Sequence, residues 1–200
     1  MSAGTEQRKL AAIMFTDMVG YSALAQRNEA LAIELLEEHR RLLRSIFPHH
    51  NGHEIETAGD AFLVELASAL EATRCAVEIQ RGLSARNQAQ PPERPIQLRI
   101  GIHVGDVVHK DGKVMGDAVN IAARIEPLAE PGGICISNAV FEQVRNKVEL
   151  PLVRLGEPEL KNIDAPVVAI AARSRSQSNA GRWLLRPACL CWWWLTFSCF

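Results

Sequence analysis

Apolar residues recur every three or four positions in several stretches of this chain, which is the pattern of helices that bury one face. In the longest stretch most of these positions are leucine, and Pro48 and Gly52 follow where the helix has to end. A later stretch stops at the run Pro131-Gly132-Gly133. The pattern predicts four helices, over residues 22–47, 68–87, 117–128 and 138–146.

Shorter runs between these helices have the composition of strands. Isoleucine and leucine alternate with polar residues over 96–102, and this predicts a half-buried strand that continues through 105–108 into a partner strand before a turn region at Gly112. The pair Gly59-Asp60 separates two short runs and predicts a tight hairpin with Asp60 at its turn. The predicted strands are 10–16, 54–57, 61–66, 96–103, 105–108, 134–137, 152–155 and 167–171. Helices packed on one face of an antiparallel sheet make an α+β fold.

Composition and charge narrow the class of protein but do not select a partner. A chain of 200 residues, 48% of them hydrophobic and with a formal net charge of −1, is long enough for one globular domain and has no basic excess for nucleic acid. Its five cysteines show neither a CxxC nor a Cys/His zinc spacing, which is typical of a reducing, cytoplasmic setting. Residues 1–9 form a polar tail without the apolar core of a signal peptide, so we expect no export of the domain.

The C-terminal part of the chain differs in composition from the rest. Residues 173–182 form a basic, polar linker, and residues 183–200 are mostly apolar. A membrane helix needs about 20 apolar residues, so this stretch is marginal, and Arg186 and Pro187 weaken it further. Two interpretations stay open: the start of a membrane helix that holds the domain at the cytoplasmic face, or a disordered or frameshifted tail.

Two aspartates lie at the ends of predicted strands. Asp17 follows the strand 10–16, and Asp60 lies in the hairpin turn. Asp60 alone would be typical of a turn, but Asp17 stands between the apolar Phe15 and Met18, where an acid needs a partner. If the two strands are neighbours, the carboxylates converge on a hard cation such as Mg²⁺ or Mn²⁺. Two such ions can activate a hydroxyl nucleophile and stabilise a pyrophosphate leaving group.

A third predicted helix carries a second pair of candidate residues. Asn120 and Arg124 are four positions apart and therefore share one helix face. Arginine can offset charge on a phosphoryl group in transfer, and asparagine can orient a ribose or its attacking oxygen. An isolated pair of this kind is more often an exposed polar face, but its place just after Gly116-Asp117 favours function. Lys161 is a candidate for binding the terminal phosphates.

Five spaced motifs now allow a resemblance to be stated. They are Phe15-Thr16-Asp17-Met18-Val19-Gly20-Tyr21-Ser22, Gly59-Asp60, Gly101-Ile102-His103-Val104-Gly105-Asp106, Gly116-Asp117-Ala118-Val119-Asn120-Ile121-Ala122-Ala123-Arg124 and Glu130-Pro131-Gly132-Gly133-Ile134-Cys135-Ile136-Ser137. In this order they resemble the class III adenylate/guanylate cyclases of bacterial type, over a catalytic domain at residues 10–172. The resemblance implies a ferredoxin-like α+β fold and a head-to-tail homodimer with two shared active sites. It also implies conversion of a nucleoside triphosphate, ATP or GTP, to a 3′,5′-cyclic nucleotide and pyrophosphate for intracellular signalling.

The same resemblance assigns roles to residues of this chain. Asp17 and Asp60 match the residues that bind two Mg²⁺ or Mn²⁺ ions in one active site, and Asn120 and Arg124 match the transition-state pair supplied by the other subunit. Lys161 matches the phosphate-binding lysine, although Asn162 follows it where glycine is common. A monomer is then expected to be inactive.

The chain departs from the adenylate cyclase pattern at the residues that read the base. Glu56 stands where lysine is usual and matches the glutamate of guanylate cyclases, and Lys113 stands where aspartate or threonine is usual. Guanine presents N–H donors and the O6 acceptor, so an acceptor and a donor at these positions modestly favour GTP over ATP. The alternative is that Glu56 and Lys113 pair with each other and leave a weak enzyme. Two other classes of protein are alternatives. One is a regulatory module without turnover, and the other is a phosphatase or polymerase with a similar aspartate pair.

Overall fold

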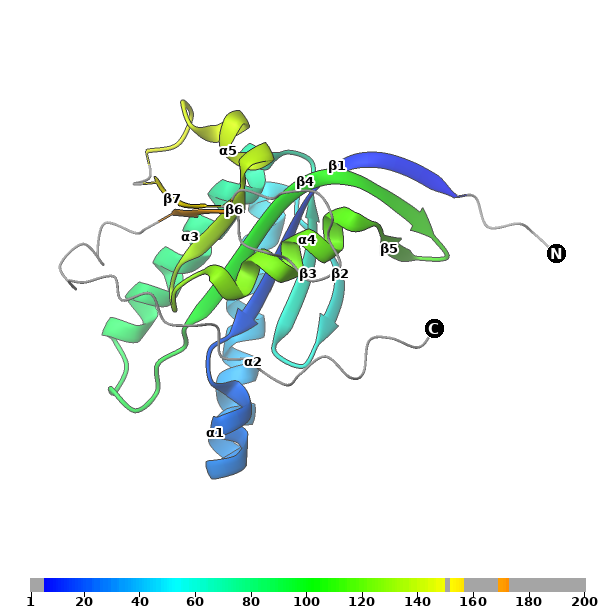
Figure 1. Cartoon of the computed structure of the whole chain (residues 1–200). Helices are drawn as coiled ribbons and strands as arrows, with labels where there is room; N and C mark the ends of the chain where they lie inside the picture. Colours follow the sequence, from blue (N-terminus) through cyan, green and yellow to red (C-terminus); the bar gives the residue numbers. More distant parts are fainter. Residues whose placement is uncertain (1–5, 150–151, 157–168, 173–200) are drawn as a thin grey trace.

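A curved sheet with helices on both faces forms the body of the molecule in this computed structural model, which describes residues 6–149, 152–156 and 169–172 (Figure 1). The strand order is β2-β3-β1-β4-β6-β8-β7, and β5 pairs with β4. The strands are β1 (Gln7–Met18), β2 (His53–Ala58), β3 (Ala61–Leu66), β4 (Leu98–Lys110), β5 (Lys113–Met115), β6 (Ile134–Ser137), β7 (Leu152–Gly156) and β8 (Ala169–Ala172). The helices are α1 (Tyr21–Arg27), α2 (Glu29–Ile46), α3 (Ala69–Gln88), α4 (Asp117–Ile125) and α5 (Asn138–Val144), with short 3₁₀ helices η1 (Phe47–His50) and η2 (Glu126–Leu128).

The part of the sheet from β2 to β4 has the ferredoxin-like order expected from the sequence. Strands β2, β3, β1 and β4 are antiparallel neighbours, and α2 and α3 connect β1 to β2 and β3 to β4. The sheet as a whole is mixed, however, because β6 pairs with β4 in parallel. A parallel neighbour requires a long crossover, and here β5 and α4 supply it. The α+β prediction is confirmed, with two differences: one pair of strands is parallel, and α4 lies on the face of the sheet opposite α2 and α3.

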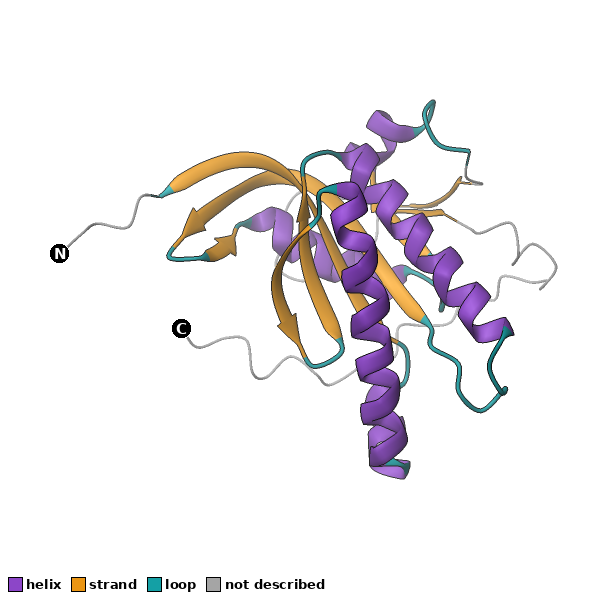
Figure 2. Ribbon diagram, turned by 180° about the vertical axis from the view of Figure 1, so that it is seen from behind, coloured by secondary structure: helices purple, strands orange, loops and turns teal. Residues whose placement is uncertain are grey.

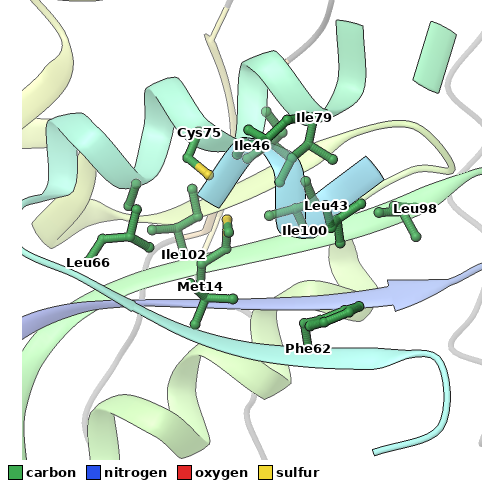
Figure 3. Close-up of a cluster of buried hydrophobic side chains, with 14 of the residues drawn as sticks. Met14, Leu43, Ile46, Phe62, Leu66, Cys75, Ile79, Leu98, Ile100 and Ile102 are labelled. Carbon is green, nitrogen blue, oxygen red and sulfur yellow. The ribbon is translucent and has the colours of Figure 1, made fainter. Parts of the chain in front are cut away.

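Two apolar layers cover the two faces of this sheet. Strand residues such as Met14, Phe62 and Ile102 pack against Leu43 of α2 and Ile79 of α3 (Figure 3). Figure 2 shows α2 and α3 together on that face. On the opposite face, alternate residues of the same strands pack beneath α4; this smaller cluster contains Ala11, Ile13, Leu63, Val107, Val114, Ala118 and Ala122. Both faces are therefore buried in the centre of the sheet, and α4 lies on the side opposite α2 and α3.

The long helix predicted over residues 22–47 is divided in two at Asn28. The backbone of Asn28 leaves the helical region (φ −154°, ψ 86°), and its side-chain Oδ1 accepts a hydrogen bond from the Leu31 amide at 3.1 Å. Asparagine is a strong N-cap because its side chain replaces a missing backbone acceptor at the start of a helix. The apolar spacing persists across the break, which is why periodicity alone predicted one helix.

The predicted strands 96–103 and 105–108 are one strand, β4. β4 pairs with β1 from Leu98 through His109, and this ladder carries it straight through Gly105. The chain reverses in the predicted turn region, at Asp111 and Gly112, whose positive φ values of 51° and 76° suit a tight hairpin into β5.

Lys161 and the segment 173–200 with its apolar end lie outside the described residues, as do residues 1–5 of the predicted tail and 167–168 of the last predicted strand. Within the described ranges, no helix is both long enough and apolar enough to cross a bilayer.

Candidate active site

The two aspartates of the predicted cation site lie together at one end of the sheet. Asp17 is the penultimate residue of β1, and Asp60 lies in the turn between β2 and β3, whose strand β3 is the neighbour of β1. The backbone amide of Met18 donates to Asp60 Oδ2 at 3.1 Å, and the charge of Asp60 acts on the Asp17 carboxyl group. Gly59 has a positive φ of 61°, which glycine adopts without strain and which turns the chain so that Asp60 follows.

The environment of this pair suits a divalent cation. Burial, then the charge of Asp60, raises the pKa of Asp17 to about 7, and burial also raises the pKa of Asp60. Two half-buried carboxyl groups close together disfavour each other's charged form, and a bound cation offsets that repulsion. No cluster of three His, Cys, Asp or Glu ligands occurs among the described residues. The two carboxylates fit Mg²⁺ or Mn²⁺, which take few carboxylates and complete their shell with water and substrate phosphates.

Arg99 is a neighbour of this site that the sequence did not single out. It stands directly opposite Asp17 in the ladder between β1 and β4, and its charge lowers the pKa of Asp17, against the effects of burial and Asp60. Its role depends on strand register, which no local pattern in the sequence specifies.

The second candidate pair lies on α4, as predicted. Asn120 is exposed and Arg124 is half-buried, while the buried residues of this helix form its other side, toward the sheet. The helix lies very close to β4, because a Cβ on Gly101 would come within 2.4 Å of the Ala122 carbonyl oxygen. Glycine at 101 thus allows α4, with Asn120 and Arg124, to seat directly on the strand.

The predicted base-reading residues are both exposed. Glu56 lies on β2, and Lys113 is the first residue of β5, opposite Lys110. Within the described part of this chain no ion pair joins Glu56 to Lys113. Both side chains are therefore available to a ligand in this structure.

Glu126, which follows α4, is a buried acid that the sequence analysis missed. Its exposed fraction is 3%, and Oε1 has no hydrogen-bond partner among the described residues. Burial, then the charge of Asp17, raises the pKa of Glu126 to about 8, and Asp60 adds to the effect. A signal was present, because Glu126 is four positions after the buried Ala122 and so continues the apolar stripe of the helix.

We expect the Glu126→Gln protein to be more stable than the parent, by an amount that grows with pH. The folded state keeps a proton on Glu126 up to about pH 8, whereas an unfolded glutamate with a pKa of 4.5 loses it, so stability falls as pH rises through this window. Glutamine cannot ionise, and the gain at pH 8 should be on the order of 3 kcal/mol, or roughly 6–12 °C in Tm.

Thermal unfolding of the metal-free protein between pH 4.5 and pH 8.5 measures this difference. The exposed loop residue Glu93 provides the control, because Glu93→Gln should change Tm by the same small amount at every pH. A constant difference between Glu126→Gln and the parent across the range would contradict the prediction.

The ferredoxin-like sheet carries an aspartate pair at one end and a helix with an Asn/Arg pair on one face, an arrangement that suits phosphoryl chemistry. The chain belongs to the family of adenylate and guanylate cyclase catalytic domains, whose model matches residues 4–171. It is 40% identical over 168 residues to putative adenylate cyclase 3 of Rhizobium meliloti (strain 1021), an alignment that covers 84% of this chain and 29% of that protein. It is 30% identical over 169 residues to bovine (Bos taurus) retinal guanylyl cyclase 2, covering 76% of this chain and 15% of that protein.

Solved structures agree with this assignment. The adenylate/guanylate cyclase/hydrolase from Silicibacter pomeroyi superimposes with a TM-score of 0.79 at 39% identity, covering 84% of this chain and 98% of that one. The resemblance stated from the sequence motifs and the fold it implied are confirmed. This chain corresponds to less than a third of the length of the curated relatives.

Proposed function

We propose that this chain is a nucleotidyl cyclase, a phosphorus–oxygen lyase that converts a nucleoside triphosphate to a 3′,5′-cyclic nucleotide and pyrophosphate. The convergence of Asp17 and Asp60 within a domain of the cyclase family is the observation that carries this proposal. Asn120 and Arg124 are present on α4, so the chain retains all four residues that the chemistry needs.

In the proposed reaction the ribose 3′-oxygen attacks the α-phosphorus. The new O–P bond forms as the bond to pyrophosphate breaks, and the hydroxyl proton leaves to solvent. Asp17 and Asp60 would hold two Mg²⁺ or Mn²⁺ ions, which supply activation of the hydroxyl and stabilisation of the leaving group. Asn120 orients the ribose, Arg124 offsets the charge that builds on the phosphoryl oxygens, and Lys161 binds the terminal phosphates.

The proposed enzyme is a homodimer with two shared active sites, each taking Asp17 and Asp60 from one subunit and Asn120 and Arg124 from the other. Two exposed apolar side chains support this assembly. Leu10 and Met115 are 66% and 45% exposed, and the strand pairing places them on one face of the extension formed by β1, β4 and β5. Figure 1 shows this extension projecting from the body of the molecule. Exposed apolar residues gathered in this way are typical of a contact surface.

GTP is the modestly favoured substrate, with ATP close behind. The exposed Glu56 offers an acceptor for the N–H groups of guanine, and Lys113 offers a donor for O6. The relatives include proteins named as adenylate cyclases and as guanylyl cyclases, so the family alone does not choose the base.

Incubation of the purified chain with Mn²⁺ and either GTP or ATP tests the activity, with product identification by mass. We expect cyclic nucleotide and pyrophosphate from both, with the higher kcat/KM for GTP. If the chain binds nucleotide but forms no cyclic product, the proposal is wrong and the chain is a regulatory module of the same fold.

A further inference from the structure

Arg40 of α2 reaches the turn that carries Asp60. Its Nη2 donates to the Gly59 carbonyl oxygen at 2.7 Å, and its Nη1 donates to Glu37 Oε1, one helical turn earlier, at 3.0 Å. The second contact fixes the guanidinium against its own helix. Arg40 thus joins α2 to the residue that directly precedes one of the two acids of the cation site.

The turn between β2 and β3 lies outside the strand pairing, so contacts from other elements can set its position. The last paired residues of the hairpin are Ala58 and Ala61, and Gly59 is exposed. Asp60 is held from one side by the Met18 amide of β1. Arg40 holds the turn from α2. Buried residues such as Leu35 and Leu43 anchor this helix in the core.

We propose that Arg40 is a positioning residue for the cation site, holding the Gly59 carbonyl so that the Asp60 carboxylate stays beside Asp17. This inference rests on the proposed function, because it assumes that Asp17 and Asp60 bind the cations. A merely structural role would make Arg40 one more link between helix and hairpin, without influence on cation binding.

Arg44 provides a matched comparison one helical turn further along. Its Nε and Nη2 donate to both carboxylate oxygens of Glu54, on β2 of the same hairpin, at 2.9 and 2.8 Å. Arg44 therefore joins the same helix to the same hairpin but contacts the strand instead of the turn. Loss of Arg44 should affect stability in a similar way and leave the cation site in place.

Binding of Mn²⁺ to the full chain, followed by electron paramagnetic resonance in the presence of a non-cyclisable GTP analogue, tests the proposal without turnover. We expect Arg40→Ala to weaken Mn²⁺ binding about 3- to 10-fold, the range for loss of one hydrogen bond. Arg40→Lys, which keeps the charge and one donor, should recover part of the loss. Arg44→Ala should bind Mn²⁺ as the parent does.

The kinetic constants of the Arg40 variants should show the same selective effect on Mn²⁺. In Arg40→Ala the Mn²⁺ concentration for half-maximal activity should rise by the same factor, whereas KM for GTP at saturating Mn²⁺ should stay within about twofold. Arg40→Met keeps the aliphatic stem without any donor, so the test stands even if the alanine variant does not fold.

Three outcomes would overturn the inference. Unchanged Mn²⁺ binding in Arg40→Ala or Arg40→Met would leave Arg40 a structural link, and tighter binding would mean that its charge merely repels the cation. Equal weakening in Arg44→Ala would assign the effect to general loosening of the hairpin. A parent protein that binds Mn²⁺ and loses it in Arg40→Ala, but forms no cyclic product, would support the inference while refuting the proposed function.

Discussion

An equal mixture of the Asp17→Ala and Arg124→Ala proteins is expected to regain cyclase activity that neither protein has alone. Asp17→Ala removes a carboxylate from the cation pair, and Arg124→Ala removes the cationic donor to the phosphoryl group, so each change should lower kcat by about 10³-fold or more. In a head-to-tail dimer the two lesions of a mixed dimer fall in the same active site, and the other site is intact. Random exchange makes about half of the dimers mixed, so recovery should approach about a quarter of parental activity. Cyclic nucleotide formation is measured before and after the two proteins are mixed.

A second mixture serves as the control. Asp17→Ala and Asp60→Ala both damage the cation pair, so every site in their mixed dimer lacks one aspartate, and no activity should return. Light scattering before mixing verifies that all three proteins are dimers. Failure of the first mixture, with dimers intact, would mean that each chain builds its whole site alone and would refute the shared-site arrangement.

Much of the fold could be predicted because its signals are local. The helix α3 and the hairpin at Gly59 and Asp60 follow from apolar spacing and turn chemistry, and the structure has them within a residue or two. The division at Asn28 and the continuity of β4 through Gly105 could not be predicted in this way. The first depends on a side chain that competes for a backbone amide, and the second on a long ladder with β1.

The same distinction between local and tertiary signals applies to the residues of the candidate site. Asp17 and Asp60 could be placed together because one ends a strand and the other forms a hairpin turn. Arg99 and Glu126 join them only through the register of β1 and β4 and the close seating of α4, which are tertiary facts. The contact of Arg40 could not be predicted for a related reason, because the sequence does not specify which distant turn a polar residue on a helix reaches.

Exchange of the two residues proposed to read the base is expected to reverse the proposed preference for GTP. In the double variant Glu56→Lys/Lys113→Asp, lysine offers a donor to adenine N1 and aspartate offers an acceptor to the exocyclic amine, while both groups oppose the edge of guanine. A well-placed pair of hydrogen bonds to a base is worth about 1–3 kcal/mol, so the ratio of kcat/KM for GTP over ATP should fall roughly 10- to 100-fold. Initial rates with each nucleotide at saturating Mn²⁺ give this ratio.

Single variants separate base reading from general damage. Glu56→Gln keeps one acceptor and should lose GTP selectivity without gaining ATP activity. Lys110 stands opposite Lys113 in the β4–β5 hairpin and is also exposed, so Lys110→Asp makes the same charge change next to the site and should leave the ratio unaltered. An equal fall with both nucleotides in the double variant would show that Glu56 and Lys113 support the fold of the site but do not read the base. If Lys110→Asp changes the ratio of kcat/KM for GTP over ATP as much as Lys113→Asp does, the effect comes from long-range charge. A directional hydrogen bond, in contrast, distinguishes neighbouring residues of the same hairpin.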